Sequence, residues 1–184
     1  MRIIGGDLKG RKLRPIRGRT IRPTSDRLRE SLFNILGDRV TNAMVLDLYA
    51  GTGALGIEAL SRGARFAVFV DRYRGALSAV AENLRQCGIQ DRARVVRWDI
   101  VRGLSCIRDH RPPFTLVFMD PPYERNLVAP ALNHLAESRA PASKSLIIVE
   151  HSVHEPAPDP PGEWTFTDQR RYGKTLVSFY SCGM

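Results

Sequence analysis

The sequence has few cysteines and no long hydrophobic run, and both absences exclude classes of protein. Its three cysteines (Cys87, Cys106 and Cys182) are odd in number and far apart, which argues against a disulfide framework or a zinc site. The longest apolar runs are strand-length, so no segment is predicted to span a membrane. The apolar stretch near the N-terminus is too short for a secretory signal. We therefore expect a reduced cytoplasmic protein without a bound metal, and a monomer, because no dimerisation segment is evident.

Lysine is also scarce, and the positive charge is unevenly spread. Residues 1–22, called the arm below, hold eight Lys/Arg and one Asp, a net charge of +7, whereas the other 162 residues have a net charge of only +2. The alternative is that the arm is only a solvated basic tail. The apolar residues that interrupt the arm argue against this. Clustered basic residues indicate a polyanionic partner, and arginine matches phosphate geometry. The arm is therefore predicted to bind nucleic acid through Arg2, Lys9, Arg11, Lys12, Arg14, Arg17, Arg19 and Arg22.

The stretch Met44–Gly56 is typical of a strand, a tight loop and a helix. An apolar run breaks into Gly-Thr-Gly, after which apolar residues recur with helical spacing. Gly51 and Gly53 lack a Cβ, so a ligand can lie against the backbone there. Such a loop after the first strand of a parallel sheet is where open α/β sheets bind nucleotide-like cofactors.

Asp47 indicates which cofactor this loop binds. Its carboxylate precedes Gly51 by four residues, where it would repel the pyrophosphate of a dinucleotide. S-adenosylmethionine has no phosphate and carries an ammonium and a sulfonium, which a carboxylate attracts. We therefore expect S-adenosylmethionine rather than a dinucleotide.

The alternation of strand and helix patterns predicts an α/β fold with a doubly wound, mostly parallel sheet of seven strands. The last two strands form an antiparallel hairpin. Strands are expected at residues 44–48, 66–71, 95–99, 114–120, 145–150, 164–168 and 176–180, and helices after the glycine loop and at 76–84 and 127–138. A weaker helical or irregular segment is expected at 100–109, and a loop at 156–161.

The N-terminal part is predicted to be a small basic β-hairpin followed by a helix. Thr24 or Ser25 can cap this helix, and Gly37 ends it. The expected apolar stripe of the helix comprises Leu28, Leu32, Phe33, Ile35 and Leu36. We divide the chain into a basic RNA-binding extension at 1–39 and a catalytic domain at 40–184. Because the glycine loop lies beyond the arm, deleting the arm is expected to leave cofactor affinity unchanged.

Four predicted strands end in aspartate, and parallel strands bring their carboxyl ends to one edge, where ligands bind. These residues are Asp47, Asp71, Asp99 and Asp120. Asp71 follows Gly53 by 18 residues, and its carboxylate can accept hydrogen bonds from both ribose hydroxyls. Asp99 is expected to accept from the adenine amine while Ile100 packs on the ring.

The stretch Asp120-Pro121-Pro122-Tyr123 is the most specific in the chain. Two prolines fix the backbone and supply no amide hydrogens, so this loop presents carbonyl oxygens and a carboxylate. Asp120 and the Pro121 carbonyl can each accept one N–H of an exocyclic amine, while Tyr123 stacks on the base. A C5-pyrimidine methylase would need a cysteine nucleophile in this loop, and none is there.

The glycine loop together with Asp120–Tyr123 resembles the class I S-adenosylmethionine-dependent amino-methyltransferases. Over nearly the full length, the chain resembles the RsmD-type bacterial 16S ribosomal RNA guanine-N2 methyltransferases. The stretches that carry this second resemblance are Arg2–Gly6, Gly10–Leu13, Arg22–Arg27, Arg29–Leu36 and Arg171–Thr175. The resemblance implies methylation of one guanine, guanine 966, in the head of an assembled or nearly assembled small ribosomal subunit.

Three alternatives stay open from the sequence. A DNA adenine-N6 or cytosine-N4 methyltransferase could use the same loop, although 184 residues leave little room for a sequence-reading domain. A protein-glutamine methyltransferase would have Asn in place of Asp120. A non-catalytic RNA-binding assembly module would need the arm but not both loops.

Overall fold

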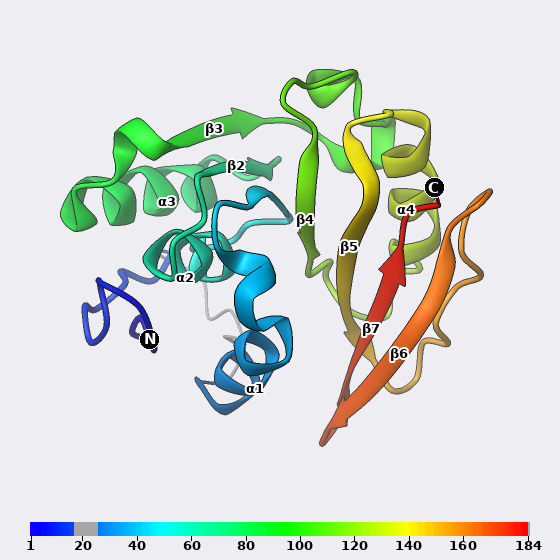
Figure 1. The fold of residues 1–184 in the computed structure, drawn as a ribbon, viewed down its shortest axis with the longest axis horizontal. Helices are drawn as coiled ribbons and strands as arrows, with labels where there is room; N and C mark the ends of the chain where they lie inside the picture. Colours follow the sequence, from blue (N-terminus) through cyan, green and yellow to red (C-terminus); the bar gives the residue numbers. More distant parts are fainter. Residues whose placement is uncertain (17–25, 184) are drawn as a thin grey trace.

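The structure, a computed structural model, describes residues 1–16 and 26–183, and its centre is one seven-stranded sheet (Figure 1). The strand order is β3-β2-β1-β4-β5-β7-β6. Neighbouring strands from β3 to β5 pair in parallel, whereas β7 pairs antiparallel with β5 and with β6. The strands are β1 (Met44–Leu48), β2 (Phe66–Asp71), β3 (Ala93–Arg97), β4 (Phe114–Met119), β5 (Pro141–Ser152), β6 (Thr165–Tyr172) and β7 (Thr175–Ser181). The predicted fold class is confirmed.

Helices cover both faces of the sheet. The α-helices are α1 (Asp26–Leu36), α2 (Ala54–Ser61), α3 (Arg74–Cys87) and α4 (Val128–Glu137). Apolar residues of α1, α2 and α3 form a core on one face, and α4 forms a second core on the other. Short 3₁₀ turns lie at η1 (Gly37–Val40), η2 (Gln90–Arg92), η3 (Ile100–Arg102) and η4 (Ser105–Ile107). Among the described residues, no helix is both long enough and apolar enough to cross a membrane.

The strand register aligns the ends of the central strands. Leu48 pairs with both Val70 and Met119, and Met119 pairs with Val149. The residues that follow these positions therefore leave the sheet at one edge. Because the chain winds outward in opposite directions from β1 and β4, this edge includes the switch point where doubly wound sheets bind ligands.

Several details differ from the sequence prediction, and β5 and β6 are longer than expected. The third strand spans Ala93–Arg97 rather than 95–99. Its partner β2 ends at Asp71, which pairs with Arg97, and Asp99 instead caps the turn η3 by accepting from the Val101 amide (3.3 Å). The predicted apolar stripe of α1 is wrong at Ile35, whose side chain is 44% exposed. The other four residues of that stripe are buried.

The predicted N-terminal hairpin is present, but its strands are reduced to one antiparallel bridge between Arg2 and Lys12. The Ile3 amide still donates to the Arg11 carbonyl across the hairpin (2.9 Å), but the amides of Ile4 and Gly5 donate to the Glu58 carboxylate of α2 instead, at 2.8 Å each. Ile3 and other arm residues belong to the same core as α1 and the sheet. The division at residue 39 therefore stays a functional prediction, without a packing boundary. The predicted caps Thr24 and Ser25 lie outside the described residues.

Candidate active site

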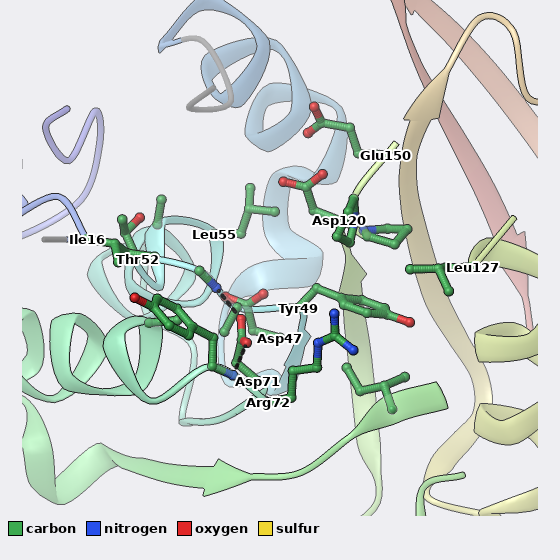
Figure 2. A pocket seen from close by; sticks show the side chains of 18 of the residues that line it. Ile16, Asp47, Tyr49, Thr52, Leu55, Asp71, Arg72, Asp120, Leu127 and Glu150 are labelled. Carbon is green, nitrogen blue, oxygen red and sulfur yellow. Dashed lines mark hydrogen bonds between the residues drawn. The ribbon is translucent and has the colours of Figure 1, made fainter. Parts of the chain in front are cut away.

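A cavity of about 840 Å³ opens along the carboxyl edge of the sheet (Figure 2). This volume is within the range of roughly 300–1,000 Å³ that is typical of small-molecule sites. Nine of the ten predicted cofactor and catalytic residues line it. They are Asp47, Gly51, Asp71, Asp99, Ile100, Asp120, Pro121, Pro122 and Tyr123.

Two carboxylates hold the glycine loop in shape. The Gly51 amide donates to Asp71 Oδ2 at 3.1 Å, and the Gly56 amide donates to Asp47 Oδ2 at 2.9 Å. A Cβ built on Gly51 would meet only the Tyr49 carbonyl, at 3.9 Å. The backbone at Gly51 is therefore open to a ligand.

Gly53 packs against the core, and its predicted contact with the cofactor stays a prediction. It does not line the cavity, and a Cβ there would lie 3.2–3.3 Å from Ile57, Val80 and Phe69 in the core. Its φ of 79° is in the left-handed region that favours glycine. Gly53 thus allows the loop to turn into α2 against the core, and the close approach of a ligand is available at Gly51 instead.

Asp47 is a buried carboxyl group in the floor of the site. The residue is only 2% exposed. The pKa of Asp47 is raised to about 8, mainly because the group is buried. The hydrogen bond from the Gly56 amide lowers this pKa, and the nearby Asp71 charge raises it. A ligand cation beside this carboxyl group would favour its ionised form.

Asp71 at the end of β2 and Asp99 after β3 present carboxylate oxygens that can accept hydrogen bonds from a nucleoside. Asp71 Oδ1 accepts from the Tyr73 amide at 2.9 Å, and Asp99 Oδ1 accepts from the Val101 amide at 3.3 Å. Both residues are only half-buried, and both line the cavity together with the buried Ile100. This set of acceptors and an apolar surface fits the ribose and adenine of S-adenosylmethionine, and an open glycine backbone and Asp47 fit its amino-acid part.

The predicted catalytic loop lies beyond β4, at the β5 side of the cavity. The Asp120 amide donates to the Leu48 carbonyl at 3.4 Å, which ties the start of the loop to β1. The Tyr123 hydroxyl donates to Glu150 Oε1 at 2.6 Å and lies 3.1 Å from Thr175 Oγ1. Burial and then the Glu150 charge raise the pKa of Tyr123 well above its usual range. The ring of Tyr123 is therefore held at a fixed place by β5 and β7.

Several lining residues were not found from the sequence. Glu150 lies near Asp120 in Figure 2 and follows Val149 on β5 at the same edge as the four aspartates. The same strand-end pattern could have identified it. Tyr49, in contrast, has a left-handed φ of 60°, which no sequence pattern indicated. Burial and then the Asp99 charge raise the pKa of Tyr49 to about 12.

The arm forms one wall of the cavity. Leu13, Pro15 and Ile16 line it, and Ile16 is buried against α3. Asn83 of α3 joins the arm to the glycine loop, because its Oδ1 accepts from the Arg14 amide (2.7 Å) and its Nδ2 donates to the Thr52 carbonyl (3.0 Å). The expectation that the arm is separate from the cofactor loop is therefore wrong, and deleting the arm would remove part of the cavity.

The basic side chains of the described arm face solvent. The residues Arg2, Lys9, Arg11, Lys12 and Arg14 are all exposed. The charge of Arg14 is only weakly paired, since its guanidinium lies 3.8 Å from the Glu82 carboxylate. The remaining three, Arg17, Arg19 and Arg22, lie outside the described residues.

Comparison with known proteins decides the family. The family described as "Conserved hypothetical protein 95" matches residues 1–181. The chain belongs to this family. It is the RsmD-type family that the sequence motifs resemble.

Named relatives and solved structures agree with this membership. Ribosomal RNA small subunit methyltransferase D of Escherichia coli is 36% identical over 180 residues, which cover 98% of this chain and 89% of the relative. The protein of the same name from Haemophilus influenzae is 34% identical and covers 97% and 91%. The structure of a hypothetical protein from Thermus thermophilus superposes with a TM-score of 0.82 at 30% identity, covering 100% of this chain and 99% of that one.

Proposed function

We propose that this protein transfers the methyl group of S-adenosylmethionine to the exocyclic N2 amine of a guanine in 16S ribosomal RNA. Relatives that are 36% and 34% identical to it over their aligned residues are named small-subunit ribosomal RNA methyltransferases. The target within the small subunit is guanine 966 by family resemblance, on an assembled or assembling particle. The protein acts as a monomer in the cytoplasm, where these particles are made.

One observation carries this proposal. The glycine loop, the strand-end acids and the Asp120–Tyr123 loop line a single cavity, and the basic arm forms its wall. A donor held over β1 and β2 and a base held beside β4 and β5 would therefore meet at the switch point between β1 and β4. The exposed charges of the arm then provide a binding surface for RNA phosphates beside the same cavity.

The loop after β4 supports transfer to an amine. Asp120 and the Pro121 carbonyl are acceptors for the two amine hydrogens, and together they aim the nitrogen lone pair at the methyl carbon. Bound S-adenosylmethionine would supply an electrophilic methyl group and would keep the electron pair of the broken S–C bond on sulfur. The Asp120 carboxylate accepts the amine proton as the N–C bond forms. Alignment of this kind contributes about 7–11 kcal/mol in favourable cases.

The substrate class is tested by incubating the protein with labelled S-adenosylmethionine and one of four acceptors. These are small ribosomal subunits, naked 16S RNA, DNA and a protein extract. We expect label in the RNA of the small subunits. Label in DNA or protein would indicate one of the other methyltransferase classes, and no label in any acceptor would indicate a non-catalytic assembly module.

A side chain at Gly51 is expected to weaken donor binding in a protein that still folds. Gly51→Val places methyl groups in the open space beside the cavity, and the left-handed φ of 56° costs about 1–2 kcal/mol. Donor affinity, measured by calorimetry, should fall by about tenfold or more. The matched variant Gly53→Val meets the core and should mainly lower thermal stability, by overpacking worth about 1–3 kcal/mol. Unchanged donor affinity in a folded Gly51→Val variant would contradict this assignment.

Donor binding is expected to release a proton from Asp47. With a pKa of about 8, this carboxyl group is mostly protonated at a pH of about 6.5, and the donor ammonium would shift it toward the carboxylate. Calorimetry at that pH in buffers of different ionisation enthalpy should report nearly one proton released per donor bound. Asp47→Asn should release none. Release of no proton by the wild type would contradict this account of Asp47, either its raised pKa or the place of the donor cation beside it.

A further inference from the structure

The turn between β6 and β7 is a second basic surface, apart from the arm. Arg170, Arg171 and Lys174 are exposed there, and we call these three residues the basic turn. Arg170 Nε lies 2.8 Å from the Asp168 carboxylate, and Arg171 Nε donates to the Gly173 carbonyl. Among the described residues, the Lys174 ammonium has no ion-pair partner. The turn therefore has a net positive charge that the fold does not neutralise.

The base of this turn is fixed to the active site. The Tyr172 and Ser31 hydroxyl oxygens lie 2.7 Å apart, which ties the turn to α1. On the other side of the turn, Thr175 Oγ1 lies 3.1 Å from the hydroxyl of Tyr123 in the predicted catalytic loop. Tyr172 and Thr175 also line the cavity. A group bound by the basic turn would thus lie at a set position relative to the base-binding loop.

The basic turn and the arm lie on different sides of α1. Figure 1 shows the turn at the lower end of the molecule, beside α1 and at the end where β4 and β5 also finish, with the arm beyond α1. Five exposed basic residues of the described arm and three of the turn therefore flank the cavity from two directions.

We propose that the basic turn binds a backbone phosphate of the RNA strand that carries the target guanine. This inference rests on the proposed function. A base must leave its stack to enter a cavity, at a cost of a few kcal/mol. If the strand is bound on both sides of that base, the unstacked base is positioned at the cavity. The arm binds the strand on one side and the basic turn on the other, while Asp120 and Tyr123 receive the base between them.

The test compares two triple variants that remove the same charges. The turn variant is Arg170→Gln, Arg171→Gln and Lys174→Gln. The control is Arg65→Gln, Arg108→Gln and Lys144→Gln, whose positions are exposed and lie near the amino ends of β2, β4 and β5, at the opposite edge of the sheet. Binding to small subunits is measured across a salt series, beside donor affinity and single-turnover methyl transfer.

We expect the turn variant to bind small subunits roughly tenfold more weakly at low salt, with a salt slope smaller by about 0.7 for each lost phosphate contact. Its donor affinity should equal that of the wild type, whereas its single-turnover transfer should be slower at subunit concentrations below saturation, because fewer particles are bound. The control variant should bind like the wild type. The charge-keeping variant Arg170→Lys, Arg171→Lys and Lys174→Arg should recover most of the binding, because the charge and not the shape of the turn is responsible.

Two outcomes would overturn this inference. If the turn variant binds like the wild type, the basic turn is only a solvated surface. If both triple variants lose binding equally, the effect is one of total charge and not of the turn. A failure of the proposed function is distinct, because the wild type would then bind or methylate no small subunits in the same assay.

Discussion

Replacing Asp120 with asparagine is expected to slow methyl transfer by about 10² to 10³-fold, by analogy with the loss of one oxyanion-hole donor. The exocyclic amine of guanine is a poor nucleophile, because its lone pair is delocalised into the ring. A carboxylate can accept hydrogen bonds from the amine and stabilise the positive charge that develops on its nitrogen as the N–C bond forms. Asparagine keeps one acceptor oxygen but loses the charge, and its own N–H groups can face the amine.

The measurement is single-turnover methyl transfer to small subunits, with donor titrations on the same preparation. Donor affinity should survive in Asp120→Asn, because Asp120 lies after β4 and the donor is assigned to the loops after β1, β2 and β3. Asp91→Asn makes the same chemical change at an exposed position in η2, before β3 begins, and should transfer at the wild-type rate. A wild-type rate in Asp120→Asn would exclude a catalytic role for Asp120. Loss of donor binding would instead show that Asp120 belongs to the donor site.

Removing the Glu58 carboxylate is expected to destabilise the protein by roughly 3–5 kcal/mol, the cost of leaving a buried partner charge uncompensated. Glu58 is fully buried. Its oxygens accept from the amides of Ile4 and Gly5 and from Arg62 Nε, at 2.8 Å each, and Oε2 lies 3.9 Å from the fully buried guanidinium of Arg29. Glu58→Ala would leave these donors without that acceptor, and the described part of the arm would keep only its hydrogen bonds to Ser61 as polar contacts with α2.

Denaturant unfolding of Glu58→Ala measures this cost directly. Glu137→Ala is the control, because Glu137 is an exposed residue at the end of α4, and such surface changes usually alter stability by no more than about 0.5 kcal/mol. Equal unfolding free energies for Glu58→Ala and the wild type would show that the arm is held by other contacts.

Much of the fold could be predicted because its signals are local. Met44–Leu48 is an apolar run that is buried along its whole length, and Gly51 and Gly53 both have the left-handed φ that the loop needs. The strand-end acids follow from topology alone, since a parallel sheet must bring Asp71 and Asp120 to one edge. Glu150 shows the same pattern, because it follows a buried apolar run on its strand.

The parts that could not be predicted depend on contacts between distant segments. Arg29 is completely buried and donates to the Arg2 carbonyl and to Asp26, whereas a basic residue on an amphipathic helix normally faces water. Asn83 lies in α3 but joins the arm to the glycine loop, and nothing in its local sequence marks it. Side chains of this kind satisfy backbone groups far away in the chain, so their role appears only when those segments are placed together.

The central claim is methylation of a guanine N2 amine in small-subunit RNA. It is tested most directly with small subunits assembled in vitro from transcribed, unmodified 16S RNA. After incubation with the protein and S-adenosylmethionine, the RNA is digested and its nucleosides are identified by mass spectrometry, with the modified position located by primer extension. We expect one N2-methylguanosine per particle, at guanine 966, and none with Asp120→Asn. Methylation of another base, or of another atom of guanine, would contradict this claim.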